Sequence, residues 1–200
     1  MSAPAPVAVF VSGTGRHLET LVRLARAGAL GAEIRLVVAS RAGIPALDRA
    51  RALDLPAVVI DPERKLDVHA FSERAFAEVE RAGCRHVVLA GFLRKLALPP
   101  AWRGRVLNIH PSLLPAFGGQ GYYGERVHRA VLERGCQVSG CTVHLVDDEY
   151  DHGPILTQRA VPVRPDDTVD TLAARVFQAE LVALPEALRA HLAQSAEARP

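Results

Sequence analysis

The sequence predicts an α/β protein in which a mostly parallel, twisted sheet is flanked by helices on both faces. Two features of the first 110 residues predict this class. Short apolar runs such as residues 7–12, closed by glycine or polar residues, are typical of strands buried on both faces. Segments with apolar residues at helical spacing separate these runs. Strands that alternate with helices form right-handed βαβ units, so the strands are expected to be parallel.

The expected elements follow in chain order. Strands are expected at residues 7–12, 33–40, 57–60, 86–90 and 106–109, with helices at 18–28, 44–53 and 68–82 between them. Beyond residue 120 the alternation changes to a helix at 125–134, strands at 140–146 and 155–163, and a helix at about 168–191. Pro185 is expected to break or kink that last helix. The two ends, residues 1–6 and about 194–200, are expected to fray.

The composition of the 200 residues excludes several classes of protein. The hydrophobic fraction of 49% and the charged fraction of 23% are typical of one soluble globular domain. The net charge is only +2 and no basic run is present, so no nucleic-acid partner is expected. No apolar stretch reaches spanning length and residues 1–6 lack the pattern of a signal peptide, so no membrane partner is expected. Three cysteines without metal-site spacing fit reduced thiols and a cytoplasmic location.

The only asparagine of the chain, Asn108, closes a strand-like run two residues before His110. An asparagine amide can donate to an oxyanion, a histidine can donate a proton, and a carboxylate can tune that histidine. Asp151, in the later run Asp-His-Gly-Pro, would join them if that later loop folds back onto the end of the strand. A nearby carboxylate should raise the pKa of His110. The alternative is an asparagine that serves only as a turn residue before Pro111.

A second motif, Ser12-Gly-Thr-Gly15, joins the first expected strand to the first helix. Such a loop presents backbone N–H groups at the positive end of a helix dipole, which suits a phosphate. The dinucleotide-binding fingerprint would need a third glycine where Leu18 stands, so a monophosphate is preferred to a dinucleotide. A tight turn without any ligand remains the alternative.

Ligands of open parallel sheets bind at the carboxyl ends of the strands, so three loops are expected to meet there. They are the glycine loop, residues 91–96 and residues 110–115. A hydrolase that uses Ser112 is rejected because the chain lacks the G-x-S-x-G elbow. A loose set of possible metal ligands matches no standard spacing, so no metal is expected. The set comprises His144, Asp147, Asp148, Asp151 and His152.

Together, these motifs resemble the folate-dependent formyltransferases, over residues 7–185. The resemblance rests on Asn108 to Pro115, on Asp151 to Pro154, on residues 12–15 and 87–94, and on Gly140 to His144. In length and layout, the chain is most similar to the enzymes of this family that formylate glycinamide ribonucleotide in purine biosynthesis. The resemblance implies a Rossmann-like formyltransferase fold and direct transfer of the formyl group of 10-formyltetrahydrofolate to the primary amine of that acceptor.

The resemblance also implies a role for each matching residue. Asn108 and His110 would bind the formyl oxygen of the tetrahedral intermediate, His110 would act as general acid, and Asp151 would hold it. Residues 1–200 would form one domain with a phosphate-binding half (about 7–105) and a folate and catalytic half (about 106–190). The implied binding residues are Gly13, Gly15, Arg16 and His17 for the phosphate, Glu180 for the ribose and glycinamide, and Leu93, Arg94, Lys95, Leu96, Asp147, Asp148, Glu149 and Tyr150 for the folate, largely through backbone.

Some residues depart from the family pattern. The family has Ser-Asn where this chain has Arg16-His17, and a folate-side arginine where it has Val68. The glycine-rich stretch 118–124 is an insert that would form a different lid. An amino sugar therefore remains an alternative acceptor, and hydrolysis of formyltetrahydrofolate an alternative reaction. The partners implied are small molecules, with the protein as a monomer or a homodimer.

Overall fold

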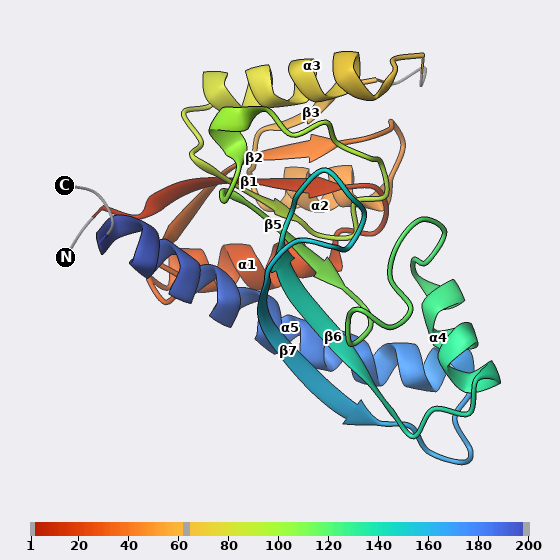
Figure 1. Cartoon of the computed structure of the whole chain (residues 1–200). Coiled ribbons are helices and arrows are strands. Elements are labelled where there is room, and N and C mark those ends of the chain that lie inside the picture. The colour runs from red at the N-terminus through yellow and green to blue at the C-terminus, as the bar shows by residue number, and fades with distance from the viewer. Residues whose placement is uncertain (1–2, 62–64, 198–200) are drawn as a thin grey trace. The chain divides into compact units, whose positions relative to one another are not determined.

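The computed structural model describes residues 3–61 and 65–197 (Figure 1). Over these residues, seven strands form a sheet in the order β3-β2-β1-β4-β5-β6-β7. The strands are β1 (Ala5–Val11), β2 (Ala32–Ala39), β3 (Ala57–Val59), β4 (His86–Leu89), β5 (Val106–His110), β6 (Val138–Leu145) and β7 (Ile155–Pro162). The helices are α1 (Arg16–Arg26), α2 (Pro45–Ala52), α3 (Val68–Arg81), η1 (Pro100–Trp102, a 3₁₀ turn), α4 (Glu125–Glu133) and α5 (Val169–Glu197). The α/β class expected from the sequence is confirmed.

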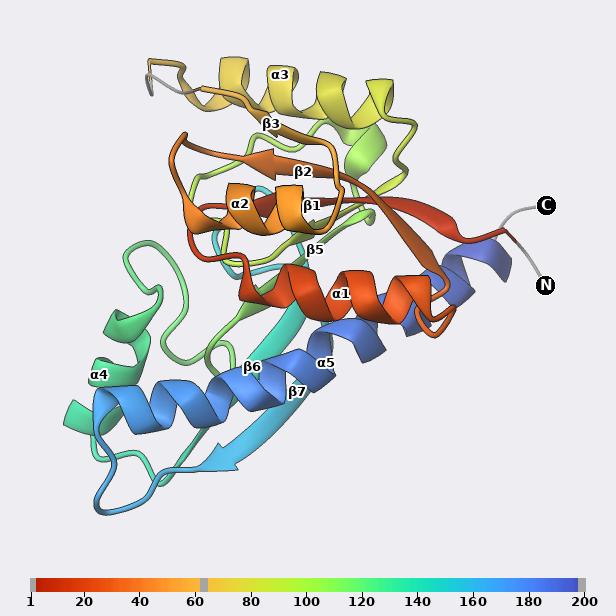
Figure 2. The same ribbon diagram turned by 180° about the vertical axis from the view of Figure 1, so that it is seen from behind.

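The chain divides into two compact units, and the first comprises Met1–Leu107 and Leu188–Pro200. Its central strand β1 pairs in parallel with β2 and β4, and β2 pairs in parallel with β3. Residues 7–11 of β1 are fully buried because helices cover both faces of this part of the sheet. Helices α1 and α2 lie on one face, in front of β1 and β2 in Figure 2. Right-handed crossovers then place α3 on the opposite face, where Phe76 of α3 packs against Phe10 of β1.

The second unit comprises Asn108–Ala187. Strands β6 and β7 are antiparallel, with Cys141 opposite Arg159. Gly140 in β6 allows this pairing, because a Cβ there would overlap the Arg159 carbonyl oxygen. Helix α4 buries Val127, His128 and Val131 on one face. No helix of residues 3–61 and 65–197 is long and apolar enough to cross a membrane.

The structure corrects two details of the predicted elements. Helix α5 continues through Pro185, so of the expected break or kink the break does not occur. A proline inside a helix costs about 3 kcal/mol or more, but full burial of one leucine side chain recovers about 1.5–3 kcal/mol. Ala183, Leu184 and Ala187 surround the proline and are 0–5% exposed, so their packing offsets the cost. The ends are also more ordered than expected, since β1 begins at Ala5 and α5 reaches Glu197.

Candidate active site

Strand β5 ends with Asn108 and His110, whose side chains lie on the same face of the sheet because they are two residues apart. The apolar residues Val106 and Leu107 are fully buried and anchor the strand. His110 is buried and Asn108 half-buried. The end of the strand thus presents one amide and one imidazole from a fixed backbone.

Asp151 lies in a tight turn after β6. Gly153 of this turn has no room for a side chain, because a Cβ would overlap the Leu145 carbonyl oxygen. The Leu145 N–H donates to the Pro154 carbonyl at 2.8 Å and closes the turn. Asp151 itself has a φ of 54°, a left-handed conformation that aspartate tolerates better than most residues. The glycine and the turn together fix the backbone from which the carboxylate projects.

The side chains of Asn108, His110 and Asp151 form one cluster within the second unit. His110 Nδ1 lies 3.3 Å from Asp151 Oδ2. Asn108 Nδ2 donates to Asp151 Oδ1 at 3.2 Å. The structure therefore brings together the three side chains that the motifs select, although they are 43 residues apart in the chain.

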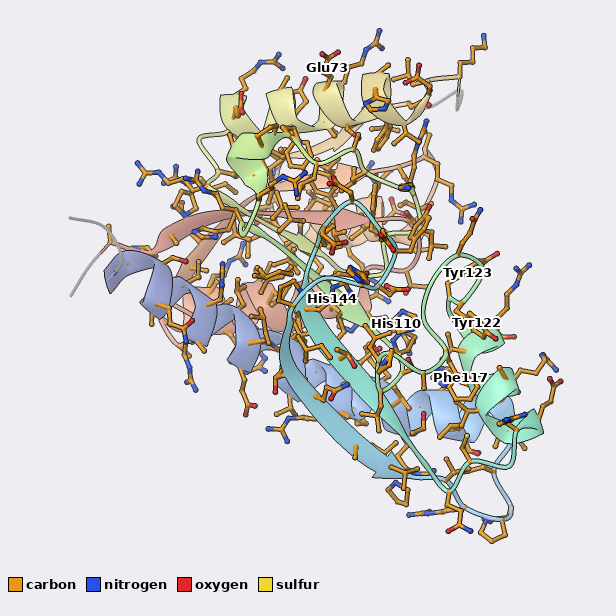
Figure 3. The ribbon with its side chains drawn as sticks, in the orientation of Figure 1. Glu73, His110, Phe117, Tyr122, Tyr123 and His144 are labelled. Carbon is orange, nitrogen blue, oxygen red and sulfur yellow. The ribbon has the colours of Figure 1, made fainter. Side chains whose placement is uncertain are left out.

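His144 of β6 is a fourth member of the cluster (Figure 3). Its Nδ1 lies 2.8 Å from the Leu145 carbonyl, which can only accept, so Nδ1 carries the proton. Its Nε2 then accepts from Asn108 Nδ2 at 3.0 Å. The sequence places His144 in a possible metal set and at the end of the matching stretch Gly140 to His144, but it does not predict this contact. The signal for it is the alternation of β6, since Thr142 and His144 share a face.

Two backbone groups of the loop after β5 complete the cluster. His110 Nε2 donates to the Phe117 carbonyl at 2.8 Å. The Gly119 N–H donates to Asp151 Oδ2 at 3.0 Å. Nothing in the sequence signals the first contact, and the glycine pair at 118–119 is only a weak signal of the second. Both ring nitrogens of His110 and both N–H groups of Asn108 thus face acceptors inside the protein.

Burial lowers the pKa of His110 below its ordinary value of 6.5. The Asp151 carboxylate and the Phe117 carbonyl raise that pKa, but they do not outweigh the loss of water. The expectation that Asp151 brings the pKa of His110 above its ordinary value is therefore wrong in its net direction, although the contribution of the carboxylate has the expected sign. The ring is therefore neutral at pH 7.

The pKa of Asp151 moves downward. Burial raises it, but the contacts with His144, with His110 and with the Gly119 N–H together lower it below the ordinary value of 3.8. Asp151 is therefore a carboxylate at neutral pH. Glu180, buried in α5, lies close enough for its charge to act on both His110 and His128. Burial lowers the pKa of His128, and its Nδ1 has no hydrogen-bond partner.

The glycine loop lies in the first unit. Gly15 caps α1 with a φ of 70°, and a Cβ there would lie 2.7 Å from Ala46 Cβ and 3.0 Å from Ala46 Cα. Gly13 differs, because a Cβ would meet no atom within 4 Å. Gly15 is thus required by its packing against α2, whereas Gly13 borders open space. Arg16 is exposed and His17 half-buried at the start of α1, whose first N–H groups have no acceptor within the helix.

The loop after β4 contacts the glycine loop, as expected for carboxyl ends of neighbouring strands. The Ser12 N–H donates to the Gly91 carbonyl at 3.1 Å, and the Leu93 N–H donates to Ser12 Oγ at 3.0 Å. Leu93 and Lys95 are exposed and Leu96 is buried. These contacts concern the first unit, and residues 110–115 belong to the second.

The guanidinium of Arg94 is engaged inside the first unit. Its Nη1 lies 2.6 Å from Asp61 Oδ2, its Nη2 donates to the Leu66 carbonyl, and its Cζ lies 4.1 Å from the centre of the Phe71 ring. This side chain serves the fold in the ligand-free protein. A contribution of Arg94 to folate binding would therefore come from its backbone.

The acidic residues before Asp151 form a separate arrangement. Asp147 accepts from the Glu149 N–H at 2.9 Å and pairs with His152 Nδ1 at 2.7 Å. Asp148, Glu149 and Tyr150 are exposed. Among the residues that the structure describes, no group of three or more His, Cys, Asp or Glu could hold a metal ion. The loose metal set of the sequence thus separates into the His144–Asp151 and Asp147–His152 pairs, the former 3.7 Å apart.

Residues 5–188 match the model of the formyl transferase family. The chain belongs to the formyl transferase family. The resemblance noted in the sequence is thereby confirmed over nearly all of the described residues.

Named relatives in this family include a trifunctional purine biosynthetic protein adenosine-3 from Gallus gallus, which is 43% identical over 185 residues. The match covers 92% of this chain but 18% of that protein. A chloroplastic phosphoribosylglycinamide formyltransferase from Vigna unguiculata is 40% identical over 177 residues, which cover 87% of this chain and 56% of that protein. The chain therefore spans only part of these relatives. The crystal structure of glycinamide ribonucleotide transformylase 1 from Symbiobacterium toebii has a TM-score of 0.87 and 37% identity, over 94% of this chain and 88% of that one.

Proposed function

We propose that this formyl transferase moves the formyl group of 10-formyltetrahydrofolate to the primary amine of glycinamide ribonucleotide, a step of purine biosynthesis. The observation that carries the proposal is the buried cluster of Asn108, His110 and Asp151, in a chain of this family. The names of the relatives from Vigna unguiculata and Symbiobacterium toebii support the acceptor. Asn108, His110 and Asp151 are the proposed catalytic residues.

The acceptor amine attacks the formyl carbon, so negative charge develops on the formyl oxygen and positive charge on the amine. Asn108 Nδ2 and the His110 ring are the proposed donors to that oxygen. In the structure these donors face Asp151, His144 and the Phe117 carbonyl. The formyl oxygen must therefore replace or share one of these acceptors.

The protonation states follow from the environment of the cluster. His110 is neutral in the free protein because burial lowers its pKa. An oxyanion beside the ring favours the imidazolium, so the pKa of His110 rises as the intermediate forms. Asp151, already ionised, is the base that takes the proton of the amine, directly or through water. The intermediate collapses when the bond between the formyl carbon and N10 of the folate breaks. N10 receives a proton in exchange for the one lost by the amine, so tetrahydrofolate and the formylated amine are released. Proton transfer by a positioned group contributes about 10²–10⁴-fold to a rate.

The proposed binding residues occupy both units. The first turn of α1 with Gly13, Gly15, Arg16 and His17 would take the acceptor phosphate. Glu180 would contact the ribose and glycinamide. The folate would use the backbone of Leu93 to Leu96 and of Asp147 to Tyr150. Residues 1–200 would act as one domain with a phosphate half (about 7–105) and a catalytic half (about 106–190).

The remaining partners are proposed to be small molecules only. The formyl-folate is a co-substrate, and the chemistry requires no metal. The proposed location is the cytoplasm, and the proposed state is a monomer or a homodimer. Neither a nucleic acid nor a membrane enters the reaction.

One assay separates the proposed reaction from its alternatives. Purified protein is mixed with 10-formyltetrahydrofolate and either glycinamide ribonucleotide, a phosphorylated amino sugar or buffer, and formylated amine and free formate are measured. We expect formylated amine with the ribonucleotide, and its loss in His110→Ala. Formate as the main product would indicate a hydrolase, and transfer to the amino sugar alone would indicate a different acceptor.

A further inference from the structure

The turn Phe117–Gly119 touches two members of the catalytic cluster with its backbone alone. The Phe117 carbonyl accepts from His110 Nε2 at 2.8 Å. The Gly119 N–H donates to Asp151 Oδ2 at 3.0 Å. His110 and Asp151 also contact each other, through His110 Nδ1 and the same carboxylate oxygen, Oδ2. The backbone of one turn is thus hydrogen-bonded to both His110 and Asp151.

The conformation of the turn is specified by its surroundings. Phe117 has a φ of 52° and Gly119 a φ of 89°, and a bulky residue such as phenylalanine rarely adopts positive φ. Such strained residues persist where neighbouring structure holds them, and they gather at functional sites. Gly118 has no space for a side chain, because a Cβ would overlap Leu114 Cδ2 and lie 3.3 Å from Asp151 Cβ. The Phe117 ring packs edge-on against Tyr122 of the insert, with 6.2 Å between ring centres (Figure 3).

We infer that this turn is a positioning element that holds the proton of neutral His110 on Nε2 and so makes Nδ1, beside Asp151, the nitrogen that gains and loses a proton. A carbonyl oxygen can only accept, so the hydrogen bond to Phe117 requires an Nε2–H. The lone pair of neutral Nδ1 then points to the carboxylate. A proton taken up by His110 forms a new N–H bond at Nδ1 and lies between the ring and Asp151.

The other charges around His110 act mainly on its protonated form. The Asp151 charge favours a proton on Nδ1, so in the neutral ring it competes with the Phe117 carbonyl, whose contact with Nε2 is the shorter one at 2.8 Å against 3.3 Å. Glu180 also favours the protonated ring, whereas His144 and His128 would oppose it if they were charged. The Gly119 N–H and Asn108 Nδ2 each bind the Asp151 carboxylate, on different oxygens, and keep it facing the ring.

The tautomer of His110 tests the inference without any substrate. We propose ¹⁵N NMR of histidine-labelled protein above the pKa of His110, with the His110 signals assigned by their loss in His110→Gln. The expected result is an Nε2–H tautomer, with Nδ1 as the nitrogen whose shift changes on acidification. An Nδ1–H tautomer in the unmodified protein would overturn the inference, whatever the catalytic activity is.

Gly118→Ala displaces the turn and provides the second test. A displaced Phe117 carbonyl no longer supports the Nε2–H, so we expect a mixed tautomer and a lower pKa of His110. We also expect a fall in kcat of about 10- to 100-fold, the order of loss for a misplacement of about 1 Å. The KM for the acceptor should change less than about twofold, because KM reports ground-state contacts with the substrate and this turn is not proposed to make any.

The double variant Gly118→Ala/Leu114→Ala is the matched control. Removal of Leu114 Cδ2 relieves the main overlap, so most of the tautomer and of kcat should return relative to Leu114→Ala alone. A folded Gly118→Ala protein with an unchanged His110 tautomer and pKa would refute the positioning role. The kcat readout rests on the proposed function, whereas the NMR readout does not. Correct tautomers with no formyl transfer would contradict the function alone.

Discussion

Each unit of the molecule contains a buried carboxylate with several partners, and the two differ in what those partners can do. In the first unit, Asp61 is 4% exposed and accepts from Arg94 Nη1 at 2.6 Å and from the N–H groups of Lys65 and Leu66 at 2.9 and 3.0 Å. In the second unit, Asp151 contacts His110, Asn108 and the Gly119 N–H at 3.0–3.3 Å. By contact number alone the two sites look alike.

The chemical difference lies in the partner of each carboxylate. An arginine stays protonated at every accessible pH, so the Asp61–Arg94 pair holds one charge state and serves the fold. A buried histidine changes its charge near neutral pH, so the Asp151–His110 pair can exchange a proton. Burial and hydrogen bonding alone therefore do not mark a catalytic carboxylate. The titratable partner does.

The largest expected effect is the loss of activity in Asp151→Asn. We expect kcat to fall by about 10²–10³ or more, as for the removal of an oxyanion donor, and the same for His110→Ala and Asn108→Ala. The matched control is Asp61→Asn, which should lower the Tm but reduce kcat less than about tenfold, an order of magnitude below the bottom of that range. Steady-state kinetics and thermal unfolding of both variants measure this. Near-normal kcat in Asp151→Asn would end the assignment of Asp151 as the base.

The pH dependence of the activity that remains in Asp151→Asn gives a second contrast between the two carboxylates. The Asp151 carboxylate raises the pKa of His110, so its removal lowers that pKa further below 6.5. The alkaline limb of kcat reports groups in the enzyme–substrate complex. The protonated ring that the intermediate favours is lost there at a lower pH without the carboxylate, so this limb should move to lower pH in Asp151→Asn. Asp61→Asn should leave the limb in place. An unmoved limb in Asp151→Asn would mean that another group titrates.

The glycine loop of the first unit offers a smaller effect that separates binding from folding. Gly13→Val meets open space, so we expect a nearly unchanged Tm and a KM for the phosphorylated acceptor that rises about tenfold, which corresponds to about 1.4 kcal/mol. Gly15→Val meets Ala46 and requires a positive φ, so its main effect should be a lower Tm. If Gly13→Val left the KM unchanged, the proposed phosphate site would lose its support.

The smallest expected effect is a pH dependence of stability in the second unit. Burial lowers the pKa of His128 in the folded protein below the 6.5 of the unfolded chain. The unfolded chain therefore binds more protons between these two values, and stability is complete above pH 6.5 and falls as the pH drops below it. We expect the loss in Tm between pH 7.5 and 5.5 to shrink in His128→Gln and to persist in the exposed control His69→Gln. An equal loss in all three proteins would locate the effect elsewhere.

The α/β class, most element positions and the residues of the motif can be predicted from the amino-acid sequence alone. These are local properties, since apolar periodicity, glycines and prolines act over a few neighbouring residues. Asn108 and His110 could be selected because their chemistry and their place at the end of a strand are both local. Asp151 could be joined to them only through the family resemblance, because the sequence does not fix the distance between residues 43 positions apart.

The protonation of His110 and the contacts around it depend on the tertiary structure. The net direction of the shift in the His110 pKa depends on how completely the fold excludes water from the ring, and no sequence motif encodes that quantity. The engagement of Arg94 by Asp61, the continuation of α5 through Pro185 and the left-handed Phe117 all result from long-range packing. Each is a case in which distant contacts outweigh a local preference, because burial and buried charge pairs act between residues that only the fold brings together.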